Sequence, residues 1–416
     1  MNFKLLNLSE TLLEAISYMG FEEATPIQEQ AIPAILQKKD LLACAQTGTG
    51  KTAAFILPVL NALLNEKEHN QTKVLVIVPT RELALQIDQQ IQGFSYFTNA
   101  ESIAVYGGGS GSDWEQQKKA LKSGTEIVVA TPGKLISHLA MGYVNFDHVK
   151  YLILDEADRM LDMGFYDDIR KIISYLPKER QTLMFSATMP PKIKKLASGI
   201  LKNPVEITIG LSKPAEGVSQ EVYAVFENAK VPLVKKIICN AVEAKSILVF
   251  SSTKKKVGNI VQGLRRNGYR VEGISSDLEQ EKREEVLNDF RSRQTLVLVT
   301  TDVLSRGIDI KDIDMVINFD VPGDAEDYVH RVGRTARAES KGRAVTLVSP
   351  DEMYKLFRIE TLIGRQIERK PFPKELGDAP EWKKPKAKKS NYGKKGRPHG
   401  GKRRKNFNPG RKGKAQ

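Results

Sequence analysis

Short apolar runs, rich in β-branched residues, alternate with longer amphipathic segments through most of this 416-residue chain. The runs that we expect to be strands are Leu41–Ala45, Val74–Val78, Ile127–Ala130, Tyr151–Leu154 and Thr182–Phe185, followed by Ile247–Phe250, Leu296–Thr300, Met315–Phe319 and Ala344–Val348. Nearly every position in these runs is apolar, which is typical of parallel strands that are covered on both faces. Because the alternation occurs in two successive series, it predicts an α/β chain with two doubly wound parallel-sheet domains.

Two changes in composition divide the chain. Residues 210–217, Gly-Leu-Ser-Lys-Pro-Ala-Glu-Gly, separate the two series of strands and are typical of a linker. From about Pro371 the apolar periodicity fades, and Lys, Gly, Pro and Asn dominate, a composition that cannot offset the entropy of ordering. We therefore expect an N-terminal domain over residues 1–209, a second domain over 218–368 and a disordered basic tail over 369–416.

The sequence also bears on the compartment. No stretch approaches the roughly 18 consecutive apolar residues of a membrane helix. The opening Met1-Asn2-Phe3-Lys4 lacks the charged and apolar regions of a secretion signal. Cys44 and Cys239 are the only cysteines and match no metal-ligand spacing, as expected in a reducing compartment. We therefore expect a cytoplasmic protein.

A glycine-rich loop directly follows the first expected strand. The loop reads Ala45-Gln46-Thr47-Gly48-Thr49-Gly50-Lys51-Thr52 and opens a helical pattern that runs from Thr52 to Leu64. A loop in this position binds phosphates through free backbone amides and the positive end of the helix. Lys51 would contact the β- and γ-phosphates, and the Thr52 hydroxyl would ligate Mg²⁺. The alternative, a glycine-rich turn without a ligand, leaves the Lys-Thr pair before a helix unexplained.

Acidic residues end another expected strand. Asp155-Glu156-Ala157-Asp158 follows Tyr151–Leu154, and the carboxyl end of a parallel strand is where such sheets bind ligands. Asp155 suits the Mg²⁺ shell, and Glu156 suits the activation of an attacking water. Alone, such a turn would be a solvated loop. Together with the phosphate loop, it predicts a site that hydrolyses a nucleotide.

These two motifs, together with Ser186-Ala187-Thr188, resemble those of the DEAD-box family of superfamily 2 RNA helicases. The resemblance runs from Phe3 to about Arg365, keeps the family's motif order and is greatest to bacterial RhlE-type members. It implies that both domains are RecA-like. His330-Arg331-Val332-Gly333-Arg334-Thr335-Ala336-Arg337 is similar to the family's His-Arg-x-Gly-Arg-Thr-Gly-Arg, with Ala336 in place of a glycine. The added methyl group is small, and we expect it to be tolerated.

The resemblance implies an ATP site shared by the two domains. Gly20–Gln28 looks like the family's Q motif, which lies within residues 1–29 here, and a glutamine amide can pair with adenine N6 and N7. Arginines brought to the γ-phosphate accelerate phosphoryl transfer by roughly 10³–10⁵. The positions that carry over are Phe21 and Gln28 for adenine, Gly307 and Asp309 for the ribose and phosphates, Arg334 and Arg337 for the transition state, and Asp158, Ser186, Thr188 and His330 for coupling to RNA.

The resemblance also implies contacts to RNA through both domains. The matching positions are Pro79, Thr80, Arg81, Gly107, Gly108, Thr131, Pro132, Gly133 and Lys134 in the first domain, and Thr253, Gln280, Arg283, Thr301 and Asp302 in the second. Amides and hydroxyls of these types suit phosphate and 2′-OH recognition, which holds RNA without reading its sequence. Lys134 stands where the family motif usually has arginine, so it keeps the charge but loses the planar fork. Any one of these residues, taken by itself, would be interpreted as an ordinary loop residue without a role in RNA binding.

The net charge of +14 is located at the C-terminal end. From Glu381 to Gln416 there are 15 lysines and arginines and one acidic residue, which leaves 49 basic and 49 acidic residues for positions 1–380. Trp382, Tyr392 and Phe407 lie among these cations, a combination that fits non-specific RNA binding by charge and stacking. The alternative is a tail that only increases solubility.

We therefore expect an ATP- and Mg²⁺-dependent RNA helicase that separates short duplexes locally and non-processively, or remodels RNA–protein complexes. A rival hypothesis is an ATP-gated RNA clamp, which would use the same residues to hold RNA for a partner. A generic P-loop kinase or transporter ATPase is disfavoured because neither explains the Arg334 and Arg337 motif. Partners in ribosome assembly or RNA decay are compatible with this function, but the sequence does not identify them.

Overall fold

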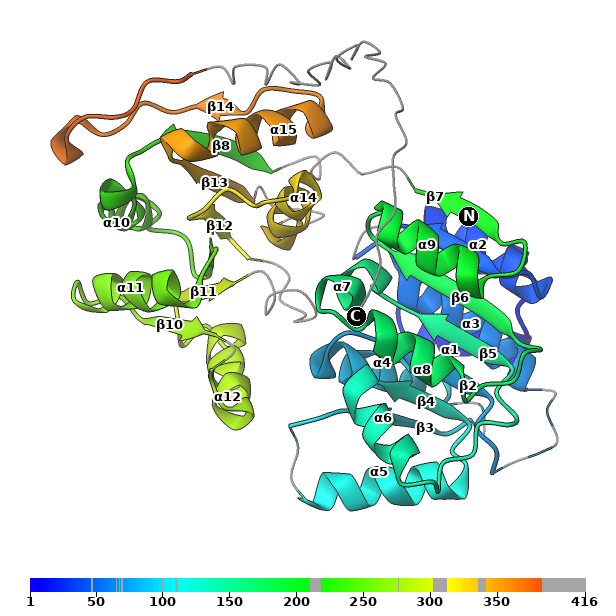
Figure 1. Ribbon diagram of the computed structural model, residues 1–416. Helices are drawn as coiled ribbons and strands as arrows, with labels where there is room; N and C mark the ends of the chain where they lie inside the picture. Colours follow the sequence, from blue (N-terminus) through cyan, green and yellow to red (C-terminus); the bar gives the residue numbers. More distant parts are fainter. Residues whose placement is uncertain are drawn as a thin grey trace, which may run out of the picture.

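The structure, a computed structural model, describes residues 1–45, 48–64, 66, 68, 70–96, 98, 100–108, 111–209, 218–275, 277–301, 313–335 and 342–383. These residues form two α/β domains, each built on a seven-stranded parallel sheet with helices on both faces (Figure 1). This architecture confirms the expected fold class. Within the described ranges, no helix combines the length and apolar character needed to cross a bilayer.

The sheet of the first domain, domain one, brings the nucleotide motifs to one edge. Its strands are β1 (Leu41–Cys44), β2 (Val74–Ile77), β3 (Ser102–Val105), β4 (Ile127–Ala130), β5 (Tyr151–Leu154), β6 (Gln181–Ser186) and β7 (Val205–Thr208). Their spatial order is β3-β4-β2-β5-β6-β1-β7, and neighbouring strands are parallel. Because β6 lies between β1 and β5, the segments that follow these three strands emerge side by side at the carboxyl edge.

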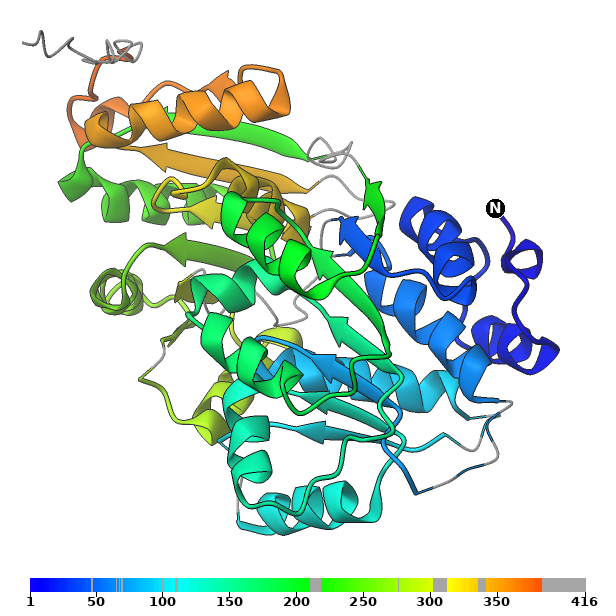
Figure 2. The same cartoon turned by 45° about the vertical axis from the view of Figure 1, so that its right-hand side comes forward.

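The helices of domain one cover both faces of this sheet. They are η1 (Phe3–Leu6), α1 (Glu10–Tyr18), α2 (Pro26–Leu36), α3 (Lys51–Leu63), α4 (Arg81–Phe94), α5 (Gly111–Ser123), α6 (Pro132–Ala140), α7 (Ala157–Asp162), α8 (Tyr166–Ile173) and α9 (Pro191–Ile200). Successive strand residues point to opposite faces, so Leu41 and Ala43 join the core under α1–α4, whereas Leu42 joins the core under α6–α9. Figure 2 shows the two helical layers on either side of the sheet.

The second domain, domain two, repeats this plan. Its strands are β8 (Ser219–Ala224), β9 (Ile247–Ser251), β10 (Val271–Ile274), β11 (Val297–Thr301), β12 (Met315–Asn318), β13 (Arg343–Val348) and β14 (Glu368–Arg369), in the spatial order β10-β11-β9-β12-β13-β8-β14. Its described helices are η2 (Glu227–Ala229), α10 (Lys230–Asn240), α11 (Lys254–Arg265), α12 (Gln280–Arg291), α14 (Ala325–Val332), η3 (Gly333–Thr335), η4 (Pro350–Glu352), α15 (Met353–Ile363) and η5 (Lys374–Leu376). One apolar core lies under α10 and α11, and two others lie under α12, α14 and α15.

The nine strands expected from the sequence are all present within a residue at each end, but five further strands were not expected. β3 and β7 are the edges of the first sheet, β10 and β14 are the edges of the second, and β8 lies next to the two-residue β14. These strands carry polar side chains such as Glu206, Gln220 and Glu272. Such polar side chains interrupt the continuous apolar run that marks the central strands.

The expected start of a disordered tail at residue 369 needs correction. That position lies inside β14, and the described chain continues through η5 to residue 383. Phe372 and Leu376 pack against the core of domain two, and the Arg369 guanidinium lies 4.4 Å from the centre of the Trp382 ring. These few apolar and aromatic contacts hold residues 369–383 against domain two, although the sequence of this segment has no apolar periodicity. Residues 384–416 lie outside the described residues.

Candidate nucleotide site and RNA-binding face

The phosphate loop joins β1 to α3, as its sequence predicted. Gly50 is the N-cap residue of α3 and has φ = 88°, a left-handed conformation that glycine adopts without strain. Lys51 begins the helix and is buried, with its Nζ 3.9 Å from Asp155 Oδ1. Within the described structure this Nζ makes no hydrogen bond. A buried ammonium group without a hydrogen-bond partner, at the positive end of a helix, fits a phosphate ligand.

The structure describes four other residues of the loop, Ala45, Gly48, Thr49 and Thr52. Ala45 is buried, and its backbone N–H donates to Ser186 O, which ties the loop to β6. Gly48 also has a positive φ of 86°, and Thr52 lies half-buried in the first turn of α3. Thr49 lies between these two glycines. Gln46 and Thr47 lie outside the described residues, so their expected contacts stay predictions.

Asp155 is almost completely buried at the end of β5, beside the phosphate loop. Burial raises its pKa to about 6, an effect that the nearby charge of Glu156 increases and that of Lys51 opposes. Its Oδ1 accepts a hydrogen bond from the Glu156 backbone N–H. Among the described residues no cluster of three His, Cys, Asp or Glu could hold a metal ion. One carboxylate with one hydroxyl is instead the kind of partial ligand set that Mg²⁺ completes with phosphate oxygens and water.

Glu156 adopts an unusual backbone conformation at the start of α7. Its φ of 51° and ψ of 47° place it in the left-handed region, which costs a residue other than glycine about 1–2 kcal/mol. Its Oε2 lies 3.2 Å from Arg159 Nη1 in a pair that is buried on both sides. Strain of this kind is typical of functional sites, because the surrounding structure must hold it in place. Glu156 is also one of the residues that line the cavity described below.

The buried amide of Gln28 connects the Q motif to the phosphate loop. Its Oε1 accepts from the Thr25 backbone N–H at 2.9 Å, and its Nε2 donates to Gly50 O at 3.0 Å. A methyl group at Gly50 would approach this Nε2 to 2.5 Å, so the contact requires glycine. Phe21 packs against Phe94, with ring centroids 5.6 Å apart, and is only half-buried. The expected contacts of Gln28 and Phe21 with adenine stay predictions.

Asp158 joins the acidic motif of β5 to the motif that follows β6. Its Oδ2 accepts hydrogen bonds from both the backbone N–H and the hydroxyl of Thr188, each at 2.9 Å. The fully buried Ser186 donates its hydroxyl to Thr188 O at 2.7 Å. The three residues that were expected to couple the nucleotide and RNA sites within domain one are therefore linked by hydrogen bonds, with Thr188 between Asp158 and Ser186.

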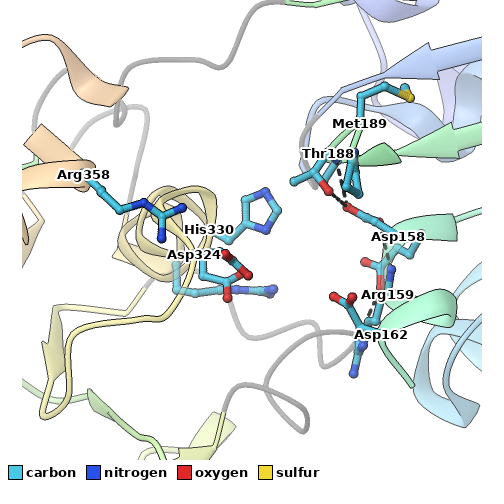
Figure 3. A pocket seen from close by; sticks show the side chains of 13 residues that line it. Asp158, Arg159, Asp162, Thr188, Met189, Asp324, His330 and Arg358 are labelled. Carbon is cyan, nitrogen blue, oxygen red and sulfur yellow. Dashed lines mark hydrogen bonds and ion pairs between the residues drawn. The ribbon is translucent and has the colours of Figure 1, made fainter. Parts of the chain in front are cut away.

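A cavity of about 400 Å³ separates these residues from domain two (Figure 3). Glu156, Asp158 and Thr188 line it from domain one, whereas His330 and Arg334 line it from domain two. The structure thus brings the expected water-activating carboxylate and one expected transition-state arginine to the same cavity. Five charged lining residues were not expected from the sequence: Arg159, Asp162, Asp324, Asp327 and Arg358. Arg337, Gly307 and Asp309 lie outside the described residues.

The expected RNA contacts of domain one lie at the carboxyl edge of its sheet. Pro79 and Thr80 precede α4, and the Thr80 hydroxyl caps this helix by accepting from the Leu83 N–H. The Arg81 guanidinium lies 4.5 Å from the centre of the Tyr106 ring, and its Nη1 donates to Gly108 O at 3.1 Å. The remaining residues of the group are the exposed Gly107, next to Gly108, and Thr131, Pro132, Gly133 and Lys134, which open α6.

In domain two the expected RNA contacts lie at helix and strand ends. Thr253 caps α11 by accepting from the Lys256 N–H at 3.3 Å, and Gln280 is the first residue of α12. Thr301 ends β11, and Asp302 lies outside the described residues. Backbone amides and hydroxyls at such ends are available to phosphates.

Two reciprocal ion pairs join the two domains at the arginines that are expected to bind RNA. Arg81 Nη2 lies 2.9 Å from Glu284 Oε1, and Arg283 Nη1 lies 3.4 Å from Glu82 Oε1. These pairs could not be predicted from the sequence, because each joins residues about 200 positions apart. Each expected RNA-binding arginine thus faces a carboxylate of the other domain.

Comparisons with known proteins agree with this geometry. The DEAD/DEAH box helicase family matches residues 25–196, and the helicase conserved C-terminal domain matches residues 229–339. The ATP-dependent RNA helicase CshA of Listeria monocytogenes is 42% identical over 368 residues, which is 88% of this chain and 69% of that protein. The DEAD-box ATP-dependent RNA helicase RhpA of Helicobacter pylori is also 42% identical, over 88% of this chain and 73% of that protein.

A solved structure matches both domains together. S. cerevisiae Dbp5 bound to RNA and ADP BeF3 aligns with a TM-score of 0.79 at 30% identity, over 89% of this chain and 95% of that chain. The particular likeness to RhlE-type members stays a prediction. The likeness to the DEAD-box family is confirmed by motifs, fold and sequence identity alike, and the chain belongs to this family of helicases.

Proposed function

We propose that this protein hydrolyses ATP in response to RNA and uses the cycle to separate short RNA duplexes locally and non-processively, or to remodel RNA–protein complexes. One observation carries the proposal. Glu156 of domain one and Arg334 of domain two line the same cavity, while the RNA-binding arginines of both domains lie together elsewhere on the interface. Nucleotide chemistry and RNA binding therefore both depend on how the two domains meet.

The nucleotide chemistry follows from the residues around the cavity. Lys51 would neutralise phosphate charge, and Glu156 would orient and polarise the attacking water. Thr52 and Asp155 would hold Mg²⁺, which supplies further charge neutralisation on the phosphates. Arg334 would stabilise the charge that develops on the transferred group. Gln28 and Phe21 would select adenine, and Gly307, Asp309 and Arg337 would complete the site from domain two.

RNA would bind across both domains at Arg81, Arg283 and the neighbouring amides and hydroxyls. Contacts to the backbone of one strand from two domains fix the path of that strand. A duplex whose strand is held in a bent path loses base pairs locally, and hydrolysis with product release then reopens the domains. The reducing cytoplasm is the compartment that we propose for this cycle.

The proposal is tested by a strand-displacement assay on a short RNA duplex, with ATP hydrolysis followed in parallel. We expect hydrolysis to be RNA-stimulated and displacement to require ATP, with duplexes of two or more helical turns separated poorly. RNA retained in an ATP-dependent way without displacement would instead support the clamp. Hydrolysis at the same rate with and without RNA would contradict both functions.

A further inference from the structure

A buried polar cluster lies between α5 and α6, beneath the RNA-binding face of domain one. His138 of α6 has no exposed surface, and its ring stacks on the Trp114 indole of α5 with centroids 4.0 Å apart and an interplanar angle of 15°. The His138 Nε2 lies 3.2 Å from Gln117 Oε1, and its Nδ1 is hydrogen-bonded to the Tyr143 hydroxyl. Lys134, one helical turn before His138, places its ammonium group 4.1 Å from the centre of the Trp114 ring.

The same cluster reaches the loop that carries the two glycines. Gln117 Nε2 donates to Tyr106 O at 3.3 Å, and Tyr106 immediately precedes Gly107. Arg81 also contacts this loop, through the Tyr106 ring and Gly108 O. Thus the cluster around His138 contacts the glycine loop and Lys134 directly, and it reaches Arg81 through Tyr106.

The hydrogen bonds around His138 define one arrangement of donors and acceptors. Since the Gln117 amide group donates to Tyr106 O, its Oε1 must accept, and His138 Nε2 carries the proton. The Nδ1 of the neutral ring then accepts from the Tyr143 hydroxyl. Burial, and after it the charge of Lys134, lowers the pKa of His138 to about 4, so the ring is neutral near pH 7.

Lys134 stands where an arginine would present a planar fork to a phosphate. A lysine ammonium is a point charge on a flexible four-carbon stem, so its position depends on what the stem and the charge contact. An aromatic face attracts an ammonium group, and Trp114 offers such a face at 4.1 Å. Trp114 is held in turn by the stacked and fully buried His138.

We propose that Trp114, Gln117 and His138 are positioning residues that hold Lys134 and the glycine loop in the geometry that binds RNA phosphates. The inference rests on the proposed RNA-binding function and adds to it the residues that preorganise domain one for RNA. None of the three needs to touch RNA. Their effect is to make Lys134 and the Tyr106–Gly108 loop one rigid unit instead of two independent contacts.

The test is a double-mutant cycle on Trp114 and Lys134 in the full-length protein, read out by RNA-stimulated ATP hydrolysis. Trp114→Ala should raise the half-saturating RNA concentration about tenfold, while kcat at saturating RNA and KM for ATP change by less than about twofold. It should also flatten the dependence of log K on log[salt] by about 0.7, the contribution of one phosphate contact. Trp114→Phe keeps an aromatic face and should retain most of the wild-type RNA affinity. The double variant with Trp114→Ala and Lys134→Ala should bind RNA as well as Lys134→Ala alone.

Fully additive effects of the two substitutions, or a fall in kcat with unchanged RNA affinity, would overturn the inference. Gln116→Ala, at an exposed position on the same helix, is the matched control and should change neither quantity. If Trp114→Ala does not fold, Gln117→Leu tests the same cluster and should also weaken RNA affinity without changing KM for ATP. If RNA does not stimulate ATP hydrolysis by the wild-type protein, the proposed function is contradicted. If the wild type is stimulated by RNA but the variants keep wild-type RNA affinity, only this inference is contradicted.

Discussion

The nucleotide side and the RNA side of the interdomain interface are built differently. On the nucleotide side Asp158 and Thr188 bond to each other within domain one, and Arg334 faces them across a cavity. On the RNA side the domains meet directly, because Arg81 and Arg283 pair with Glu284 and Glu82.

This difference indicates how each ligand affects closure. A nucleotide would add negative charge between the buried Lys51 of domain one and Arg334, which lines the cavity from domain two. If Arg81 and Arg283 bind RNA as proposed, RNA phosphates would replace the carboxylates of Glu284 and Glu82, so RNA binding would exchange one anionic partner for another. We therefore expect nucleotide-side substitutions to change rate strongly and RNA-side substitutions to change affinity moderately.

The largest effect is expected from Arg334→Ala. RNA-stimulated hydrolysis should fall by roughly 10³–10⁵, which is about 4–7 kcal/mol, because the arginine acts mainly on the transition state. The Kd for ATP should rise far less, and measuring both quantities separates the two roles. A loss seen chiefly in the Kd would make Arg334 a ground-state ligand. Arg358→Ala, which removes another arginine that lines the same cavity, is the matched control and should have a small effect.

Glu156→Gln should lower hydrolysis by roughly 10²–10⁴, because the amide cannot accept a proton from the attacking water. It keeps the size of the side chain and an oxygen that can accept from Arg159. ATP-dependent RNA binding should persist or strengthen, giving a protein trapped in the closed state. Phosphate release and RNA retention with ATP are the two measurements. Simultaneous loss of both activities would show that the strained Glu156 backbone has a structural role instead.

Removing residues 384–416 should weaken RNA binding at low salt by about 10²–10³ while barely changing kcat at saturating RNA. The deletion removes 14 lysines and arginines but keeps Trp382 and its contact with Arg369. If about six of these cations neutralise phosphates, the slope of log K against log[salt] should flatten by about 4. A salt titration of RNA binding for both proteins provides the measurement. An unchanged slope would show that the tail only increases solubility.

The smallest effect is expected from neutralising the carboxylates on the RNA side. Glu82→Gln combined with Glu284→Gln removes two negative charges beside Arg81 and Arg283. RNA affinity without nucleotide should rise by about 3- to 10-fold, since phosphates no longer compete with these carboxylates. Fluorescence anisotropy with a labelled RNA strand measures this change. A fall in affinity would mean that the ion pairs orient the arginines for RNA rather than compete with it.

The central strands and the motifs that follow them could be predicted from the sequence alone. β1, β2, β4, β5 and β6 are buried on both faces, so their apolar runs are unmistakable, and β9, β11, β12 and β13 follow the same rule. The positions of the phosphate loop and of Asp155–Asp158 then follow, because loops after parallel strands emerge at one edge. Strands such as β3 and β10 lie at the sheet edges, where fewer positions must be apolar, so their sequences were not recognised as strands.

Which charged and aromatic side chains contact one another depends instead on how the elements pack in three dimensions. Arg81 and Glu284 are about 200 positions apart, and nothing in the sequence around either residue indicates the other. His138 and Trp114 belong to no motif, and their stacking depends on how α5 packs against α6. Burial on both faces leaves a periodic record in the sequence, whereas a contact between two side chains on different elements depends only on their final positions and leaves none.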